Sequence, residues 1–253
     1  MRKGIILSAG RGSRLSQLTR ITPKGLLPVY DQPMITYSLE VMKSLAICDV
    51  LIITNPKDLH RFTNLLGAGT NYGINLHYEI QESPKGPGEA LLIAERFLDG
   101  APSVLMFADN IFFDPMNFKV FKSIASEHKR GASFLGVYNN PGAFGVAKLD
   151  LDNKLVDIIE KPNSHISNYV VPGLYFYDEH APSYAKELSP SLRNELEITD
   201  LNKIYISDNQ AKITLLPPDI TWYDAGTYDS LLAASNFAKD AYHETNVVQL
   251  QID

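Results

Sequence analysis

Residues 4–28 read GIILSAGRGSRLSQLTRITPKGLLP, and this stretch decides the fold we expect. Residues 5–7 form a short apolar run that predicts a buried first strand. The glycines that follow let the backbone turn tightly and expose its N–H groups to phosphate oxygens. Arg14 and Lys24 supply fixed positive charge beyond the turn. The stretch therefore predicts a loop that binds a triphosphate.

Other types of glycine loop fit this stretch less well. A dinucleotide-binding loop needs a third glycine where this chain has Leu15, and a P-loop needs a Gly-Lys-Ser/Thr end that is absent. An NAD-binding fold also needs a ribose-binding acid at a strand end about 20 residues further on. Asp31 lies near that distance but in the turn-like Asp31-Gln32-Pro33. A plain turn with solvated Arg14 and Lys24 remains open on these residues alone.

The composition is that of an ordinary globular protein, with 253 residues of which 45% are hydrophobic and 21% charged. The net charge of −6 gives no general attraction to nucleic acid, so we expect no nucleic-acid partner. No stretch approaches the roughly 20 apolar residues that span a bilayer. The single Cys48 cannot form an internal disulfide. We therefore expect a cytoplasmic protein without a membrane partner.

Apolar runs rich in β-branched residues alternate with helical spacing along the chain. This order predicts a Rossmann-like α/β fold: a mixed, mostly parallel sheet flanked by helices, with a smaller second lobe. We expect one domain over residues 1–253 with a boundary between its two parts near residue 140. The expected strands are 5–7, 50–54, 76–80, 104–107, 133–138, 145–149, 156–159, 174–177 and 213–216, and the expected helices are 33–45, 59–66, 88–98 and 230–241.

Two aspartates stand where a ligand site is expected. Asp109 ends the apolar run Leu105 to Ala108, and Asp224 precedes the glycine turn at Gly226. Magnesium commonly takes one or two carboxylates and completes its shell with water and phosphate oxygens. Because ligands gather at the carboxyl ends of parallel strands, Asp109 and the loop at Gly10 are expected to meet there. A helix cap or turn is the alternative role for each aspartate taken alone.

Three other polar groups have the chemistry of a ligand site. Glu160 and Lys161 follow an expected strand and offer an acceptor for sugar hydroxyls and a cation for a phosphate. Gln81 can both donate to and accept from the edge of a pyrimidine base. Arg193 and the charges of residues 195–200 lie beside an expected helix start, where capping competes with any binding role. The six histidines form no metal-ligand spacing.

The chain resembles the sugar-phosphate nucleotidyltransferase family, and the thymidylyltransferase branch of it most closely. The similarity covers nearly the whole sequence. It rests on Gly-x-Gly-Ser-Arg-Leu at 10–15, Pro-Lys-x-Leu-Leu-Pro-Val-Tyr-Asp at 23–31, Asp-Asn-Ile-Phe at 109–112, Phe-Gly-Val-Ala at 144–147, Glu-Lys-Pro at 160–162, Gly-Leu-Tyr-Phe-Tyr-Asp at 173–178, Glu-Leu-Glu-Ile-Thr-Asp at 195–200 and Trp-Tyr-Asp-Ala-Gly-Thr at 222–227.

The resemblance implies an enzyme that joins a nucleoside triphosphate, dTTP in this branch, to a sugar 1-phosphate such as glucose 1-phosphate, and releases pyrophosphate. It implies Mg²⁺ as cofactor, a nucleotide-binding part over 1–140, a sugar-binding part over 141–253, and a homo-oligomer. The implied catalytic residues are Arg14 and Lys24, and the implied metal ligands are Asp109 and Asp224. The implied nucleotide-binding residues are Leu7, Ala9, Gly10, Gly12, Ser13, Gln81, Gly86 and Asp109. The implied sugar-phosphate-binding residues are Gly145, Glu160, Lys161, Gly173 and Trp222.

Five positions depart from the pattern of the thymidylyltransferase branch. That branch usually has Ala-Gly-Gly where this chain has Ser8-Ala9-Gly10, and Gly25 stands where it has glutamine, Phe144 where it has tyrosine and Asn194 where it has glycine. A uridylyl- or cytidylyltransferase acting on another sugar phosphate therefore stays open, as does a non-catalytic protein that binds nucleotide sugars.

Overall fold

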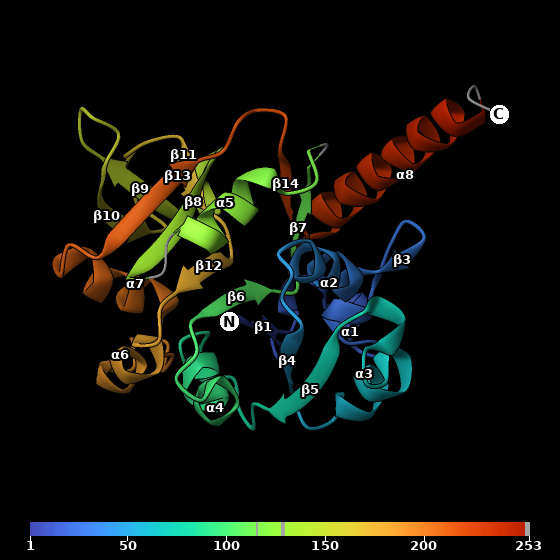
Figure 1. Ribbon diagram of the computed structural model, residues 1–253, viewed down its shortest axis with the longest axis horizontal. Helices are drawn as coiled ribbons and strands as arrows, with labels where there is room; N and C mark the ends of the chain where they lie inside the picture. The colour runs from blue at the N-terminus through green and yellow to red at the C-terminus, as the bar shows by residue number, and fades with distance from the viewer. Residues whose placement is uncertain (115, 128–129, 251–253) are drawn as a thin grey trace.

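The computed structural model describes residues 1–114, 116–127 and 130–250. A ten-stranded sheet runs through the described chain in the order β10-β9-β11-β8-β12-β6-β1-β4-β5, and β13 pairs with β8 beside this path (Figure 1). Its strands are β1 (Lys3–Leu7), β4 (Asp49–Thr54), β5 (Asn75–Ile80), β6 (Ser103–Phe107), β8 (Ala132–Tyr138), β9 (Gly145–Leu149), β10 (Leu155–Glu160), β11 (Tyr169–Val171), β12 (Leu174–Tyr177) and β13 (Ala211–Leu215). Two small ribbons accompany it, β2 (Pro28–Val29) with β3 (Gln32–Pro33) and β7 (Asn110–Phe113) with β14 (Thr221–Asp224).

Helices cover both faces of this sheet. They are α1 (Ser16–Thr19), α2 (Met34–Ser44), α3 (Leu59–Leu66), α4 (Glu89–Leu98), α5 (Lys119–Glu127), α6 (Ala181–Glu187), α7 (Ile198–Ser207) and α8 (Tyr228–Leu250). Short 3-10 turns occur at Ser13–Leu15, Lys24–Leu26, Thr70–Tyr72 and Pro141–Ala143. In the described chain, no helix combines the length and the apolar character that crossing a membrane requires.

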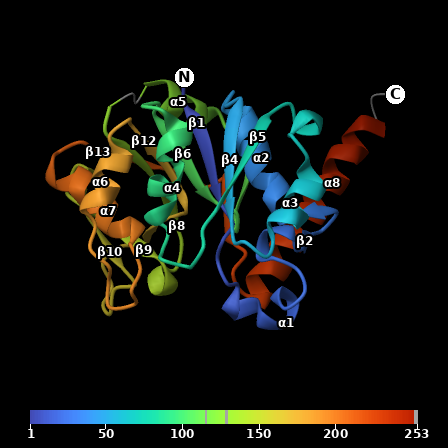
Figure 2. The same ribbon diagram turned by 90° about the horizontal axis from the view of Figure 1, so that it is seen from below.

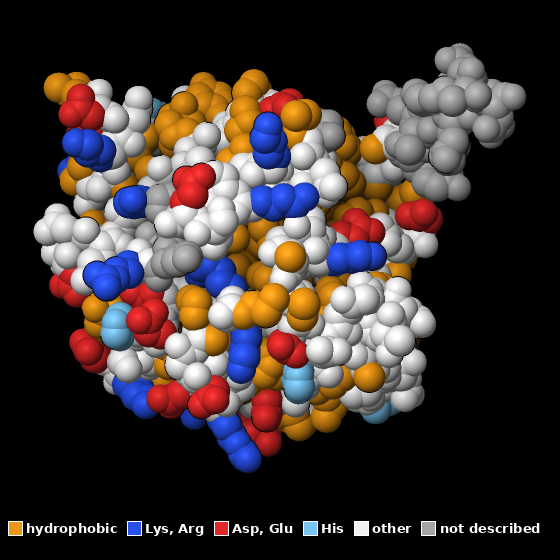
Figure 3. Space-filling view, viewed as in Figure 1, with side chains coloured by type: hydrophobic (Ala, Val, Ile, Leu, Met, Phe, Trp, Pro, Cys, Tyr) orange, Lys and Arg blue, Asp and Glu red, His pale blue; other side chains and the backbone are white. Residues whose placement is uncertain are grey.

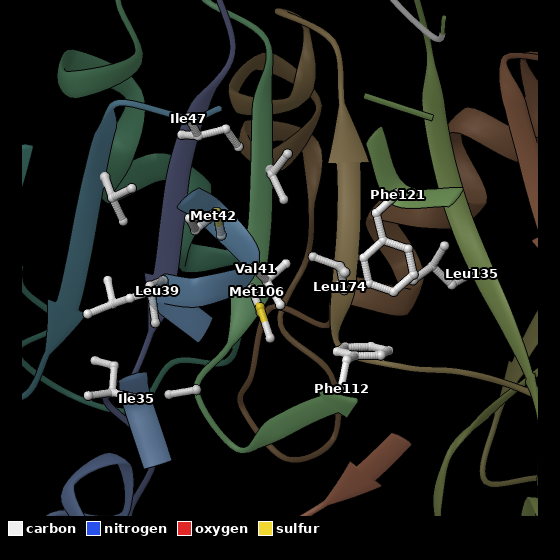
Figure 4. Close-up of a cluster of buried hydrophobic side chains, with 14 of the residues drawn as sticks. Ile35, Leu39, Val41, Met42, Ile47, Met106, Phe112, Phe121, Leu135 and Leu174 are labelled. Atoms are coloured by element: carbon white, nitrogen blue, oxygen red, sulfur yellow. The ribbon is translucent and has the colours of Figure 1, made fainter. Parts of the chain in front are cut away.

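The strands bury side chains on both faces, in alternation. Ile6 of β1 belongs to the cluster under α2, α3 and α5, whereas its neighbour Ile5 belongs to the cluster under α4, α6 and α7. Successive side chains of a strand point to opposite faces, so a continuous apolar run fills two cores at once. Figure 2 shows α4, α6 and α7 on one side of the central strands and α2 and α3 on the other. Figure 4 shows Leu39, Val41 and Met42 of α2 in the same apolar cluster as Met106 of β6.

A third apolar cluster holds the ribbons and the last helix against the body. Leu15, Leu27 and Val29 pack in it with Ile111 of β7 and Ala234 of α8. The buried side chains of Leu15 and Leu27 thus anchor the loops that carry Arg14 and Lys24. Packing around the site loops therefore depends on segments from both ends of the chain.

The expected mixed α/β sheet flanked by helices is confirmed. The strands β5, β4, β1 and β6 are parallel neighbours, and the antiparallel pairs join β12, β8, β11, β9 and β10. Most expected elements lie within a residue or two of those observed. Only the start of α7 was expected, and α1, α5, α6 and the short strands β2, β3, β7, β11 and β14 were missed, because runs this short carry little periodicity. The last helix extends to Leu250 rather than ending at residue 241.

Candidate active site

The glycine loop leaves the carboxyl end of β1 and passes into a 3-10 turn at Ser13–Leu15. Gly12 has a φ of 61°, in the left-handed region, and an added Cβ would lie 2.7 Å from Cγ2 of Thr19. The hydroxyl of Thr19 donates to the Gly12 carbonyl at 3.1 Å and closes the loop. Only glycine fits this position without strain, as the sequence pattern predicted for a tight turn.

A cavity of about 500 Å³ opens over this loop, at the carboxyl ends of β1 and β6. Such strand ends are where ligands bind in open α/β sheets. The structure brings together there nine of the residues that the sequence marked as nucleotide-binding or catalytic. They are Leu7, Gly10, Gly12, Ser13, Arg14, Lys24, Gln81, Gly86 and Asp109. Ala9 is buried and lines a neighbouring cavity of about 500 Å³ instead.

A further cavity, of about 260 Å³, lies on the side of the second lobe. Four of the five residues expected to hold a sugar phosphate line it, together with Asp224. They are Gly145, Glu160, Gly173 and Trp222. The two spaces meet at six residues that line both cavities, of which four are charged. They are Arg14, Asp109, Arg193 and Glu195, with Pro87 and Phe107.

Lys161 does not line any of these three cavities. Its backbone has a positive φ of 43°, and its Nζ lies 3.4 Å from Oε1 of Glu160 with both side chains partly exposed. Its expected contact with a sugar phosphate therefore stays a prediction that needs a change of side-chain position.

Asp109 and Asp224 come together through the short ribbon. β7 begins at Asn110 and β14 ends at Asp224, and these two residues are opposite one another in the antiparallel register. The Ala225 N–H also donates to the Asp109 carbonyl at 2.8 Å. Lys24 forms an ion pair with Asp109, and Arg14 lies 3.4 Å from Asp224. Two ion pairs, Lys24 with Asp109 and Arg14 with Asp224, thus bring charged side chains from four separate segments into one cluster.

The two carboxylates have pKa values shifted in opposite directions. Burial acts to raise the pKa of Asp109, but the charge and hydrogen bond of Lys24, with the Asn110 amide, outweigh it and lower that pKa below its usual value. Burial raises the pKa of Asp224, and the negative charge of Asp109 raises it further against the opposition of Lys24 and Arg14. Lys24 thus favours the ionised form of Asp109, whereas the surroundings of Asp224 disfavour its ionised form.

Asn110 was missed by the sequence reasoning as a site residue. Its Oδ1 accepts from the Trp222 Nε1–H at 2.9 Å and from the Gly173 N–H at 2.8 Å, and its Nδ2 donates to Asp109 at 2.9 Å. The indole N–H of Trp222 is therefore used within the protein, and its ring packs edge-on against Phe144 with 5.0 Å between ring centroids. The signals in the sequence were its place next to Asp109 and in the motif Asp-Asn-Ile-Phe at 109–112.

Arg193 is a residue whose binding role the sequence left open against helix capping. Its guanidinium donates to both oxygens of Glu197, at 3.0 and 2.9 Å, and its side chain is half exposed where the two cavities meet. Nearby, the Thr199 hydroxyl donates to Glu160 Oε2 at 3.0 Å and so orients that carboxylate toward Gly145. The Arg and Glu residues noted around position 195 thus carry more than helix capping.

A divalent metal fits the carboxylate pair. Among the described residues, no group of three histidine, cysteine or acidic side chains surrounds a metal position. Oδ1 of Asp224, however, is buried without a hydrogen-bond partner. A buried oxygen that lacks a donor costs stability and is the kind of ligand that magnesium takes in pairs alongside substrate oxygens.

The fold and the two adjoining cavities define an α/β protein whose candidate site lies at the carboxyl ends of parallel strands, where such sheets bind their ligands. A profile of the family described as nucleotidyl transferase matches residues 3–241. The chain belongs to this family and is a nucleotidyltransferase.

Named relatives agree with this membership. The glucose-1-phosphate thymidylyltransferase of Xanthomonas campestris pv. campestris (strain B100) is 45% identical over 237 residues, which are 93% of this chain and 80% of the relative. A crystal structure assigned to the same activity from Bacillus anthracis, with sucrose bound, superposes with a TM-score of 0.88 at 37% identity and covers 95% of this chain and 96% of that one. A UDP-glucose pyrophosphorylase bound to UDP-glucose shares the fold, with a TM-score of 0.83 at 24% identity and coverage of 97% and 99%.

Proposed function

We propose that the protein transfers a thymidylyl group from dTTP to glucose 1-phosphate, forming dTDP-glucose and pyrophosphate. The observation that carries the proposal is the meeting of a phosphate-loop cavity and a second polar cavity at Arg14, Asp109 and Arg193. Two substrates that react with each other need adjoining spaces with fixed charge between them. The names and identities of the relatives support the choice of thymidylyl and glucose.

The first cavity is assigned to the nucleotide. Backbone N–H groups of the loop at Gly10, Gly12 and Ser13 would face the triphosphate, with Arg14 and Lys24 as its cations. Gln81 and Gly86 are assigned to the base and Leu7 and Ala9 to the floor of the site. The overall net charge of −6 makes these local groups necessary for holding a polyanion.

The second cavity is assigned to the sugar 1-phosphate. Glu160, oriented by Thr199, would accept hydrogen bonds from sugar hydroxyls, and Gly145 and Gly173 leave room for the ring. Arg193 would hold the sugar phosphate at the junction, and Lys161 would join it after a change of rotamer. Trp222 forms part of the wall of this cavity. Its ring packs against Phe144, and its indole N–H donates to Asn110.

The reaction is an in-line displacement. An oxygen of the sugar phosphate attacks the α-phosphorus of dTTP, the bond from that phosphorus to the bridging oxygen breaks, and pyrophosphate leaves with the electron pair. Such transfer depends on positioning and charge neutralisation rather than on a covalent intermediate. Arg14 and Lys24 stabilise the charge that builds on the phosphate oxygens, while Arg193 aligns the attacking group.

Asp109 and Asp224 are the residues that would hold Mg²⁺. Asp224 would offer it the unpaired Oδ1, and a cation held there would supply charge neutralisation for the phosphate oxygens. Lys24 keeps Asp109 ionised and so ready to act as a ligand.

Pyrophosphate release tests the proposal. The protein would be assayed with Mg²⁺ and glucose 1-phosphate against dTTP, UTP, CTP, ATP and GTP in parallel, and then with dTTP against a panel of sugar 1-phosphates. We expect the highest kcat/KM with dTTP and glucose 1-phosphate. A clear preference for UTP would reassign the chain to uridylyl transfer. Nucleotide binding without release from any pair would support a non-catalytic binding protein.

A further inference from the structure

The amide of Gln81 has one orientation that its neighbours allow. Nε2 donates to the Gly86 carbonyl at 3.1 Å and to Oε2 of Glu89 at 2.9 Å. Both neighbours are acceptors, so the NH₂ group must face them, and turning the amide over would place its oxygen against two other oxygens. Within the described residues no donor reaches Oε1 of Gln81, although the residue is buried and lines the nucleotide cavity.

Glu89 is the stronger of these two acceptors. It is the first residue of α4, where the positive end of the helix dipole favours a carboxylate. Its other oxygen, Oε1, lies 3.7 Å from Nζ of Lys85. Hydrogen bonds to a charged acceptor are stronger than those to a neutral carbonyl. Glu89 therefore contributes more than Gly86 to fixing the Gln81 amide.

The orientation leaves Gln81 an acceptor to offer the base. Thymine and uracil carry an N–H at N3 that can donate to such an oxygen, whereas cytosine carries a lone pair there and would be repelled. An unmatched polar group in a desolvated site gives stronger discrimination than a difference in size. The oxygen of the Gln81 amide thus favours thymine and uracil over cytosine through the group at N3 of the base.

We propose that Glu89 is a positioning residue that selects nucleotides with an N3–H base by locking the Gln81 amide with its oxygen toward the base. This inference rests on the proposed function, because it assumes that the base lies against Gln81. Glu89 itself needs no contact with the nucleotide. Its effect passes through the amide that it orients.

The test compares dUTP with dCTP, which differ only at the base edge in question. Binding of each nucleotide by calorimetry and kcat/KM for each with glucose 1-phosphate would be measured on the wild type and on Glu89→Gln. We expect the wild type to favour dUTP. In Glu89→Gln the side-chain amide can donate to a reversed Gln81, so the dUTP:dCTP ratio should fall about tenfold, the size of one charge-assisted hydrogen bond.

Lys85→Gln is the matched control. It removes the exposed charge beside Glu89 but leaves the Gln81 contact in place, so both nucleotides should change by the same small factor. An equal loss for dUTP and dCTP in Glu89→Gln would reduce Glu89 to a structural role and overturn the inference. An unchanged ratio, or a wild type that does not discriminate, would also overturn it while the proposed transfer stood. Absence of transfer with every nucleotide would count against the proposed function itself.

Discussion

Two aspartates share the centre of the site, and each has a cation at a different distance. Lys24 makes a close ion pair with Asp109, while Asp224 has the more distant Arg14 at 3.4 Å and an oxygen without any donor. At this scale the charge state of each carboxylate depends on how close its cation lies and on how many donors it has.

Asp109→Asn should reduce kcat for pyrophosphate release by at least ~10²-fold. The substitution keeps the shape but removes the charge that pairs with Lys24 and that would hold a metal. Loss of one preorganised electrostatic partner costs about that much. Initial rates at saturating substrates check it, with the exposed Asp152→Asn as control. Turnover like that of the wild type would remove Asp109 from the mechanism.

Asp224→Asn should make the metal-free protein more stable at neutral pH. The pKa of Asp224 is raised by burial and by Asp109, so its ionisation in the folded state costs stability as the pH rises above the unfolded value of about 3.9. The wild type should therefore lose free energy of unfolding relative to the variant as the pH rises above about 4.

Urea denaturation at several pH values, with and without Mg²⁺, measures this difference. Added Mg²⁺ should stabilise the wild type more than Asp224→Asn, because binding to the folded state adds to stability. Equal stabilisation of both proteins by the metal would exclude Asp224 as a ligand.

At the scale of elements, two loops from different halves of the chain are joined by backbone hydrogen bonds. The Leu196 N–H donates to the Lys85 carbonyl at 2.7 Å, and the Gly88 N–H donates to the Leu196 carbonyl at 2.8 Å. One loop carries Gly86 and follows Gln81, and the other carries Arg193. These two hydrogen bonds therefore fix the position of the nucleotide side of the site relative to the sugar-phosphate side.

Gly86→Ala should disturb both sides of the site together. Gly86 has a φ of 93°, and an added Cβ would lie 2.6 Å from the Leu196 carbonyl oxygen, which belongs to the backbone and cannot rotate away. We expect a loss of about 1–3 kcal/mol in free energy of unfolding and a rise in KM for both substrates.

Gly67→Ala is the matched control for this change. Gly67 also has a positive φ, of 55°, but an added Cβ would meet no atom within 4 Å. It should cost only the backbone strain, about 1–2 kcal/mol, without a change in KM. A rise in KM for one substrate alone in Gly86→Ala would show that the two loops are not coupled.

At the scale of the whole molecule, a layer of tyrosines joins the sheet to the helices on one face. Tyr175 and Tyr177 of β12 stack at 5.9 Å between ring centroids, and Tyr177 stacks on Tyr205 of α7 at 5.6 Å. All three are buried. The Tyr205 hydroxyl donates to Asp178 at 2.7 Å. On the face of the molecule that Figure 3 shows, by contrast, acidic and basic side chains are interspersed.

This layer should make the molecule unfold in alkali. Burial raises the pKa of Tyr175, Tyr177 and Tyr205 above the ordinary value of about 10. In the unfolded chain the same groups ionise from about pH 10, so the free energy of unfolding should fall as the pH rises above that value.

Tyr205→Phe should cost about 1–3 kcal/mol at pH 7 and weaken the alkaline loss of stability. Asp178 keeps donors in the N–H groups of Gly131 and His180, so the variant is expected to fold. Tyr184→Phe serves as control, because its hydroxyl lies 3.4 Å from the exposed Asp208. Denaturation curves at pH 7 and pH 10.5 check both, and identical alkaline slopes for wild type and Tyr205→Phe would contradict the argument.

Local sequence was sufficient for the elements and the loop that carry most of the chemistry. The apolar run before Gly10 and the one before Asp109 had to be buried strands, and parallel strands place both loops at the same edge of a sheet. Both loops line the same cavity. Residue spacing alone did not single out Arg193, Asn110 or Glu89 as site residues. Their roles depend on contacts that form only in the folded chain.

The sequence by itself determined the α/β sheet, the glycine loop and the set of charged residues available to the site, because periodicity and glycine positions act over a few residues. Only the tertiary structure decided which charges meet. The ribbon of β7 and β14 sets Asp224 opposite Asn110 and beside Asp109, and two backbone hydrogen bonds join the loops of Gly86 and Leu196. Burial then gives each group its charge state, because the cost of an ion depends on the neighbours that the whole fold supplies.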